Sequence, residues 1–146
     1  MPVESIAAKL ADSSRPAFLF GTVPPRENTS PEDAKAICAR FTARSAVLAT
    51  DGFIVYDIQE EGGRASTERP FPFRKTMDPS LYASYFTPLS GKTCVVYKSV
   101  IESDLKSFDK WIDTATRTHG HEAFNFVGAP TSSVIPLPLP LFDVYA

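Results

Sequence analysis

Several features that mark specialised protein classes are scarce in this sequence of 146 residues. It has two cysteines, Cys38 and Cys94, and neither has the close Cys or His neighbours that a zinc site requires. Both are predicted to be small buried hydrophobic residues. Lys and Arg total 15 against 17 Asp and Glu, a formal net charge of −2 with no basic run to attract phosphates. The composition therefore speaks against a disulfide-stapled miniprotein and against nucleic acid as a partner.

Long apolar runs are also missing. Residues 1–16 carry a polar residue every few positions, which is not the pattern of a signal peptide, and no segment approaches the length of a membrane span. We therefore expect a cytoplasmic chain with no membrane partner. With 43% hydrophobic residues, the sequence is long enough for one domain with a hydrophobic core.

The sequence does contain a regular alternation of strand and helix patterns. Four apolar or β-branched runs predict buried strands, and the segments that precede or separate them carry helix-capping residues and apolar residues at helical spacing. The predicted strands are 17–23, 53–58, 93–98 and 123–127, and the predicted helices are about 2–13, 31–41, 79–90 and 103–116. The first helix is expected to cover one end of the core.

Four strands separated by helices predict an α/β fold with a parallel sheet, since short βα units pack through right-handed crossovers. Two closures stay open, a doubly wound open sheet and a partial, four-stranded TIM-type barrel, and we favour the half barrel for residues 1–133. Residues 134–146 alternate proline with apolar residues, which predicts a separate Pro-rich tail. The open edges of a half barrel favour a homo-oligomer.

In either closure a ligand would bind where the strands end. The first strand ends near Thr22, shortly before Arg26, whose guanidinium suits an anionic group; the alternative is a rigid turn with a solvated arginine. Lys98 ends the third strand and suits a phosphate or, in a barrel lyase, a Schiff base. The alternative for Lys98 is an exposed lysine without a ligand.

The strongest local signal follows the second strand and combines carboxylates, an amide and a guanidinium. The residues Asp57, Gln59, Glu60, Glu61 and Arg64 would share one rim, and this mixture can hydrogen-bond a polar heterocycle or move a proton. The alternative is a solvated acidic loop paired with its own arginines. Asp57 and Glu60 are the candidate catalytic residues.

His119 and His121 have the spacing of a metal-binding pair. They precede the fourth strand and are therefore expected at the opposite end of the sheet, and no carboxylate or cysteine nearby completes a ligand set. We predict no metal site.

The order of these elements resembles the amino-terminal half of the methylenetetrahydrofolate reductase family over about residues 5–133. The motifs that carry the resemblance are Val-Pro-Pro-Arg at 23–26 and Phe-Val-Gly at 126–128. The resemblance implies an eight-stranded barrel that binds FAD, accepts a hydride from NADH or NADPH and reduces a folate-like one-carbon substrate. The candidate cofactor-binding residues are Thr22, Arg26, Gln59, Arg64, Lys98 and Gly128.

Two carboxylates of the family pattern are absent. The position of the family's general acid on the first strand is Gly21, and the aspartate beside the flavin after the fourth strand is matched by Ala129. We hypothesise that the cluster of Asp57, Glu60 and Glu61 takes over proton transfer in a divergent reductase. The alternatives are a non-catalytic fragment, either an inactive partial gene product or an interaction protein, and a barrel lyase that uses Lys98.

Overall fold

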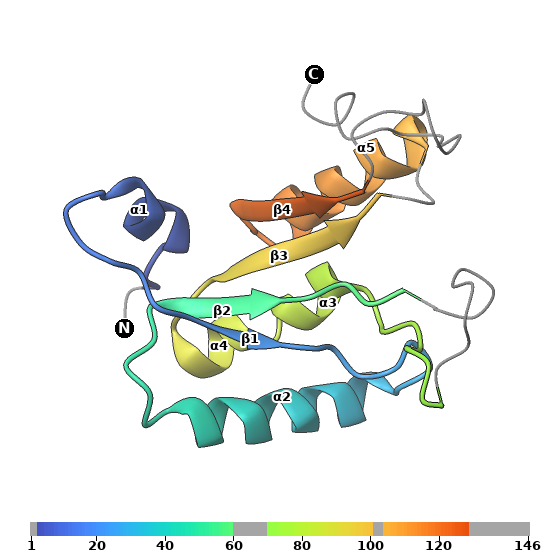
Figure 1. Ribbon diagram of the computed structural model, residues 1–146, viewed down its shortest axis with the longest axis horizontal. Helices are drawn as coiled ribbons and strands as arrows, with labels where there is room; N and C mark the ends of the chain where they lie inside the picture. Colours follow the sequence, from blue (N-terminus) through green and yellow to red (C-terminus); the bar gives the residue numbers. More distant parts are fainter. Residues whose placement is uncertain (1–2, 60–69, 101–103, 129–146) are drawn as a thin grey trace.

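The computed structural model describes residues 3–59, 70–100 and 104–128. It shows an α/β fold with one four-stranded sheet in the order β1-β2-β3-β4, and every neighbouring pair is parallel (Figure 1). All four predicted strands are confirmed. The strands are β1 Leu19–Thr22, β2 Gly52–Val55, β3 Cys94–Ser99 and β4 Ala123–Val127.

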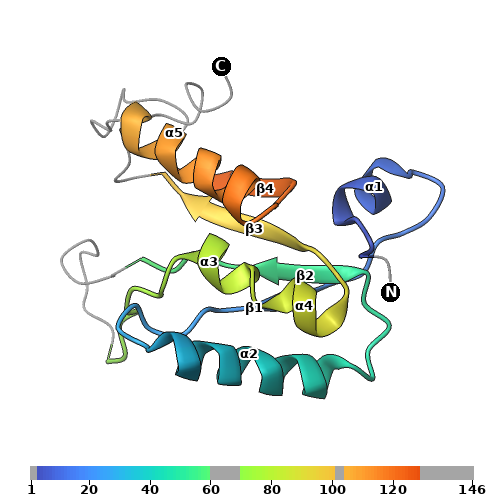
Figure 2. The same ribbon diagram turned by 180° about the vertical axis from the view of Figure 1, so that it is seen from behind.

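One helix precedes the first strand, and the others lie in the connections between the strands. They are α1 Ile6–Ala11, α2 Pro31–Ser45, α3 Pro79–Ala83, α4 Phe86–Ser90 and α5 Leu105–Asp113, the last followed by a π-helical turn at Thr114–Thr118. Seen from behind, α2 to α5 lie on the same face of the sheet (Figure 2). None of the helices in the described residues is long and apolar enough to cross a membrane.

The strand order is informative because it runs sequentially and does not reverse. A doubly wound sheet has helices on both faces and a reversal in strand order, and the described strands show neither feature. Closure into a barrel stays a prediction. The predicted boundary at residue 133 and the Pro-rich tail at 134–146 lie outside the described residues.

Capping side chains start the helices where the sequence pattern places them. The Ser30 hydroxyl accepts a hydrogen bond from the backbone N–H of Asp33 at the start of α2, and a carboxylate oxygen of Asp78 accepts from the N–H of Leu81 at the start of α3. Each of these helices has proline at its first position. The caps fix where each connection turns away from the sheet, and so they shape the rim at which the strands end.

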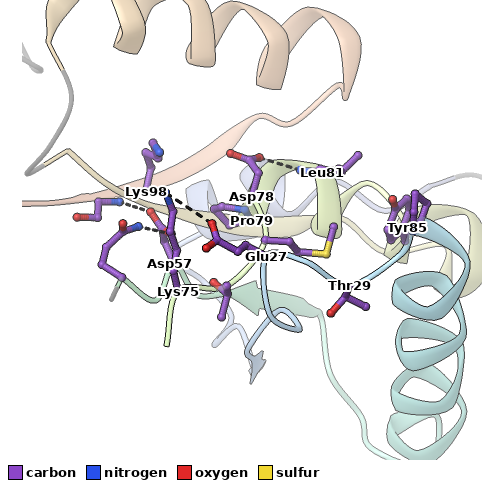
Figure 3. A pocket seen from close by; sticks show the side chains of 14 residues that line it. Glu27, Thr29, Asp57, Lys75, Asp78, Pro79, Leu81, Tyr85 and Lys98 are labelled. Atoms are coloured by element: carbon purple, nitrogen blue, oxygen red, sulfur yellow. Dashed lines mark hydrogen bonds and ion pairs between the residues drawn. The ribbon is translucent and has the colours of Figure 1, made fainter. Parts of the chain in front are cut away.

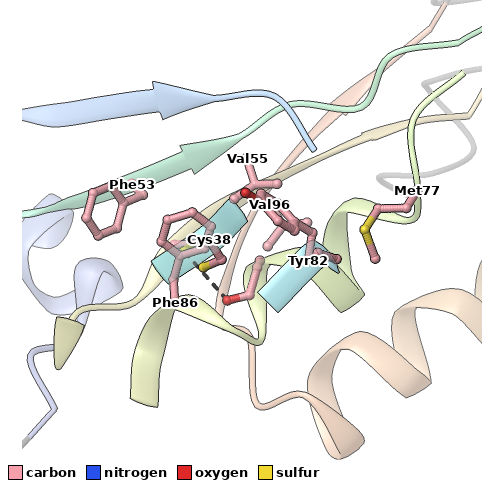
Figure 4. Packing of buried hydrophobic residues seen from close by; sticks show 10 residues of the cluster. Cys38, Phe53, Val55, Met77, Tyr82, Phe86 and Val96 are labelled. Carbon is pink, nitrogen blue, oxygen red and sulfur yellow. Dashed lines mark hydrogen bonds between the residues drawn. The ribbon is translucent and has the colours of Figure 1, made fainter. Parts of the chain in front are cut away.

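The core lies between the sheet and the helices on its covered face (Figure 4). Alternate residues of β2 and β3 point into it and meet apolar side chains of α2, α3 and α4. Both cysteines are buried there, as predicted, and burial raises the thiol pKa of Cys38 to about 11 and that of Cys94 to about 12. The central members of the core are Cys38, Phe53, Val55, Tyr82, Phe86, Cys94 and Val96.

Helix α1 packs at the edge of the sheet where the strands begin, which confirms the prediction that it covers one end of the core (Figure 1). Ile6 is fully buried, and its backbone N–H donates to the hydroxyl of Thr93 over 2.8 Å. Lys9 bonds to Glu4 at 2.6 Å and to Asp51 at 3.0 Å. This amino edge is held together by contacts within the chain.

Candidate functional site

A cavity of about 520 Å³ lies at the opposite edge, where β2 and β3 end (Figure 3). We call it the rim cavity. Three residues predicted from sequence, Asp57, Gln59 and Lys98, line it together. They meet because the carboxyl ends of neighbouring parallel strands lie at the same edge of a sheet. Glu27 and Asp78 add two more carboxyl groups to its lining from the connections that lead into α2 and α3.

The Asp57 carboxyl group is the best-defined polar group in the rim cavity. One of its oxygens accepts from the amide nitrogen of Gln59, and the other accepts from the backbone N–H of Ser99, each over 2.8 Å. Burial raises the pKa of Asp57, and the charge of Asp78 adds to the rise. The Ser99 N–H and the positive charge of Lys98 act in the opposite direction. Asp57 is therefore a half-buried carboxyl group that retains its proton to a higher pH than an exposed aspartate does.

Trp111, the one tryptophan of the sequence, contacts two residues that line the rim cavity. Its indole N–H donates to a carboxylate oxygen of Asp78 over 2.7 Å, and the ammonium group of Lys98 lies 5.4 Å from the centre of its ring. Asp78 uses its other oxygen to cap α3. These contacts hold Lys98 and Asp78 on the cavity wall, and they make Trp111 fluorescence a reporter of the site.

Arg26 does not line the rim cavity but a neighbouring one, with a volume of about 390 Å³. We call this neighbour the basic cleft, since Arg26, Arg74 and Lys75 surround it with Glu27 and Asn28. The sequence predicts Arg26 at the same site as Asp57, whereas the structure places it at the neighbouring cleft. A backbone bridge to Thr76 places Arg26 beside the rim cavity.

Thr22 and Gly128 are not among the residues that line either cavity. Thr22 is 8% exposed and lies on the helix-covered side of β1, two residues after Phe20, whose ring stacks on Phe41 of α2. Gly128 directly follows β4. Successive side chains of a strand point to opposite faces of the sheet, and the side chain of Thr22 points to the helix-covered face. Glu60 and Arg64 lie outside the described residues, so their predicted roles stay predictions.

Sequence reasoning missed two tyrosines on the face of the sheet opposite the core. The rings of Tyr56 and Tyr97 meet edge to face with their centres 5.0 Å apart. A Cβ atom on Gly21 would lie 2.7 Å from Cε2 and 2.9 Å from the hydroxyl oxygen of Tyr56. The Tyr56 ring thus fills the space into which a glutamate at position 21 would project. The signal of these two tyrosines in the sequence is an aromatic residue near the end of each of two strands, and by itself this signal indicates only a preference for strand.

The two histidines pack against Ser80. The Ser80 hydroxyl lies 2.7 Å from Nδ1 of His119, and Nε2 of His121 donates to the Ser80 carbonyl over 2.8 Å. Burial lowers the pKa of His121. Among residues 3–59, 70–100 and 104–128, no group of three or more His, Cys, Asp or Glu residues is placed to hold a metal ion.

No family model matches the chain, and no curated protein sequence matches it. Among solved structures, the chain is similar to an uncharacterized protein from Clostridium thermocellum that binds two copies of 5-methyl-5,6,7,8-tetrahydrofolic acid. The TM-score is 0.67 at 25% sequence identity, and the match covers 96% of this chain and 42% of the other. This chain therefore spans less than half the length of the protein it resembles. Membership of the methylenetetrahydrofolate reductase family is not shown.

Proposed function

We propose that this chain binds a reduced folate at the rim cavity, with the pterin ring against Asp57 and Gln59. The observation that carries the proposal is a half-buried carboxyl group, held by two hydrogen bonds, inside a cavity where two parallel strands end. Ligands of open α/β sheets bind at this edge. The similarity to a protein that binds 5-methyl-5,6,7,8-tetrahydrofolic acid supports the choice of ligand.

The chemistry of a pterin matches what Asp57 and Gln59 offer. The pyrimidine edge of the ring presents an amino group and a ring N–H as donors, with a carbonyl oxygen beside them. An ionised carboxylate has about four acceptor sites, and Asp57 uses two of them on Gln59 and Ser99. The other two are available to the pterin donors. The second N–H of the Gln59 amide can donate to the pterin carbonyl.

The size of the rim cavity fits one ligand. Small-molecule sites usually measure roughly 300–1,000 Å³. A cavity of about 520 Å³ lies within this range. The FAD implied by the family resemblance stays a prediction, and no step of the proposal uses it. Hydride transfer from NADH or NADPH through FAD stays a separate prediction, which flavin absorption bands that bleach on addition of NADH would support.

If the bound folate reacts, Asp57 is the described residue best suited to donate a proton. Burial raises the pKa of Asp57 in the direction that a proton donor requires, and its carboxyl group lines the cavity. Gly21 cannot transfer a proton, and the Tyr56 ring occupies the space beside it. Proton transfer by Asp57 is therefore the catalytic part of the proposal, and folate binding is the part to test first.

The test is isothermal titration calorimetry of the purified chain with 5-methyltetrahydrofolate. We expect saturable binding that Asp57→Asn weakens about tenfold or more, because the variant loses a charged acceptor for two donors. Asp109→Asn on the exposed side of α5 is the matched control and should bind as the wild type does. Absence of binding by the wild type, or equal affinity of wild type and Asp57→Asn, would contradict the proposal. Trp111 fluorescence gives an independent readout of the same titration.

A further inference from the structure

A further cavity, of about 480 Å³, lies on the helix-covered face of the sheet, where α3 and α5 are neighbours (Figure 2). We call it the helix groove. One wall comes from the start of α3 and the other from α5 and the π-helical turn that follows it. The residues that matter for its chemistry are Asp78, Ser80, Leu81, Lys110, Trp111 and His119.

The groove has an apolar surface that is already in place. Leu81 is a large apolar side chain on α3 that is 37% exposed, and the ring of Trp111 lies across from it on α5. The indole N–H donates to Asp78 over 2.7 Å, and the ring meets Phe124 of β4 edge to face, with the ring centres 5.9 Å apart. These two contacts fix the orientation of the indole. A fixed apolar surface suits a flat aromatic ligand, because the protein loses little freedom when it binds.

The π-helical turn places His119 at the groove. The backbone N–H of His119 donates to the carbonyl of Thr114 over 3.1 Å, five residues back in the chain. Nδ1 of His119 lies 2.7 Å from the hydroxyl of Ser80, which joins this turn to α3. With the hydroxyl donating to Nδ1, Nε2 carries the ring proton and can donate to a ligand. Single π-helical turns are frequent at functional sites.

The charged groups of the groove favour an anionic ligand. Within the described part of the chain, the ammonium group of Lys110 has no ion pair or hydrogen bond. Asp78 also lines the groove, but each of its oxygens already accepts a hydrogen bond, one from the N–H of Leu81 and one from Trp111. The groove therefore offers two donors, on Lys110 and His119, to one carboxylate of a ligand.

We infer that the helix groove is a second small-molecule site, separate from the rim cavity, and that it binds a small aromatic carboxylate. The ring of the ligand lies against Leu81 and Trp111, and its carboxylate accepts from Lys110 and His119. A volume of about 480 Å³ is within the range of roughly 300–1,000 Å³ that is usual for such sites. The inference does not depend on folate binding, because none of these donors lines the rim cavity.

The experiment titrates 2-naphthoate into the isotope-labelled chain and follows the indole N–H resonance of Trp111 by NMR, a single signal because the sequence has one tryptophan. We expect a saturable shift, with binding about tenfold weaker in Lys110→Gln and about tenfold weaker for 2-naphthamide, which has the same ring without the charge. Lys106→Gln, an exposed position on α5 outside the groove, is the matched control and should bind as the wild type does. An indole signal that does not move, or equal affinities for naphthoate and naphthamide, would overturn the inference.

A second variant, Lys98→Gln, distinguishes the helix groove from the rim cavity. Lys98 also lies near the Trp111 ring, at 5.4 Å from its centre, but it lines the rim cavity and not the groove. Unchanged affinity for 2-naphthoate in Lys98→Gln supports the groove, and a loss as large as that in Lys110→Gln overturns it. Naphthoate binding by a chain that does not bind 5-methyltetrahydrofolate supports the groove and contradicts the proposed function alone. Circular dichroism and thermal unfolding of each variant establish that it is folded.

Discussion

The two edges of the sheet place the same kinds of side chain in different surroundings. At the amino edge the charged groups bind one another or the backbone: Lys9 bridges Glu4 and Asp51, and Asp51 accepts from the backbone N–H of Phe18 over 2.8 Å. At the carboxyl edge Asp57 and the other polar groups line cavities. The amino edge is held by contacts within the chain, whereas at the carboxyl edge polar groups that also have partners, such as Asp57, surround the two cavities.

Two aspartates make this difference measurable. The Phe18 N–H and the hydrogen bond from Lys9 lower the pKa of Asp51. Burial raises the pKa of Asp57. Ionisation of Asp51 therefore stabilises the fold, whereas ionisation of Asp57 opposes it. A carboxylate that costs stability is expected at a site that serves a ligand.

The largest effect on stability is expected at the amino edge, from Ile6→Ala. Ile6 is fully buried, and truncation of a buried isoleucine costs about 2–5 kcal/mol in the free energy of unfolding. Urea denaturation measures this loss. Under conditions where the variant is folded, its affinity for 5-methyltetrahydrofolate should equal that of the wild type. A weakened affinity with little loss of stability would break the distinction between the edges.

Alanine substitution of two glycines, one at each edge, should cost less stability than Ile6→Ala does. A Cβ atom on Gly52, at the amino edge, would lie 2.7 Å from the backbone oxygen of Thr93, which cannot move away. Gly52→Ala should therefore lower the free energy of unfolding by about 1–3 kcal/mol. A Cβ atom on Gly21 meets only the outer part of the Tyr56 ring, which can rotate, so Gly21→Ala should cost less. Thermal unfolding compares the two, and an equal cost would show that the Tyr56 ring is fixed.

Substitution of the two aspartates should change stability in opposite directions. Near neutral pH we expect Asp51→Asn to lower the free energy of unfolding and Asp57→Asn to raise it slightly, provided that the introduced amide oxygen still accepts from the Ser99 N–H. Urea denaturation at pH 7 measures both. Destabilisation by both variants would show that the Asp57 carboxylate has a structural role like that of Asp51.

The pH dependence of these variants follows from the direction of each pKa shift. The stabilising contribution of Asp51 is present above its unfolded pKa of 3.8 and is lost as the pH falls through its lower folded pKa. For Asp57 the folded pKa lies above 3.8, so the native state binds more protons than the unfolded state between the two values. The wild type should therefore lose stability relative to Asp57→Asn as the pH rises through that range. If the difference in the free energy of unfolding between the wild type and Asp57→Asn does not change with pH, the raised pKa of Asp57 is contradicted.

The smallest expected effect on stability comes from His121, which is buried and has a lowered pKa. Below the ordinary value of 6.5 the unfolded chain binds a proton that the native state does not, so stability should fall as the pH falls through that value. His121→Gln keeps a donor for the Ser80 carbonyl and should flatten this dependence. Unfolding midpoints of the wild type and His121→Gln between pH 7 and about 5.5 measure how stability depends on pH. If this dependence is the same in both, a group other than His121 causes it.

The strands, the helix caps and the shared position of Asp57, Gln59 and Lys98 could be predicted from sequence. Strand and cap patterns are local, and parallel strands bring their carboxyl ends together without further information. The residues of the amino edge were not predicted as a network, because Lys9 and Asp51 are joined only by the tertiary fold.

The rest of the site depends on information that a single sequence does not contain. The bridge between Arg26 and Thr76 joins segments far apart in the chain and has no sequence signature, so the separate basic cleft could not be foreseen. The direction of Thr22 depends on strand register, where a shift of one residue exchanges the two faces. The closed barrel and self-association through its open edges stay predictions.

The measurement that tests the central claim most directly is hydrogen–deuterium exchange of the chain with and without 5-methyltetrahydrofolate, followed by mass spectrometry. We predict slower exchange on ligand binding at the carboxyl edge, in segments 25–29, 57–59, 74–79 and 98–100. Segments 4–9, 51–53 and 91–93 at the amino edge should be unchanged. Protection at the amino edge, or no protection at any described segment under saturating ligand, would contradict the assignment of the rim cavity as a folate site.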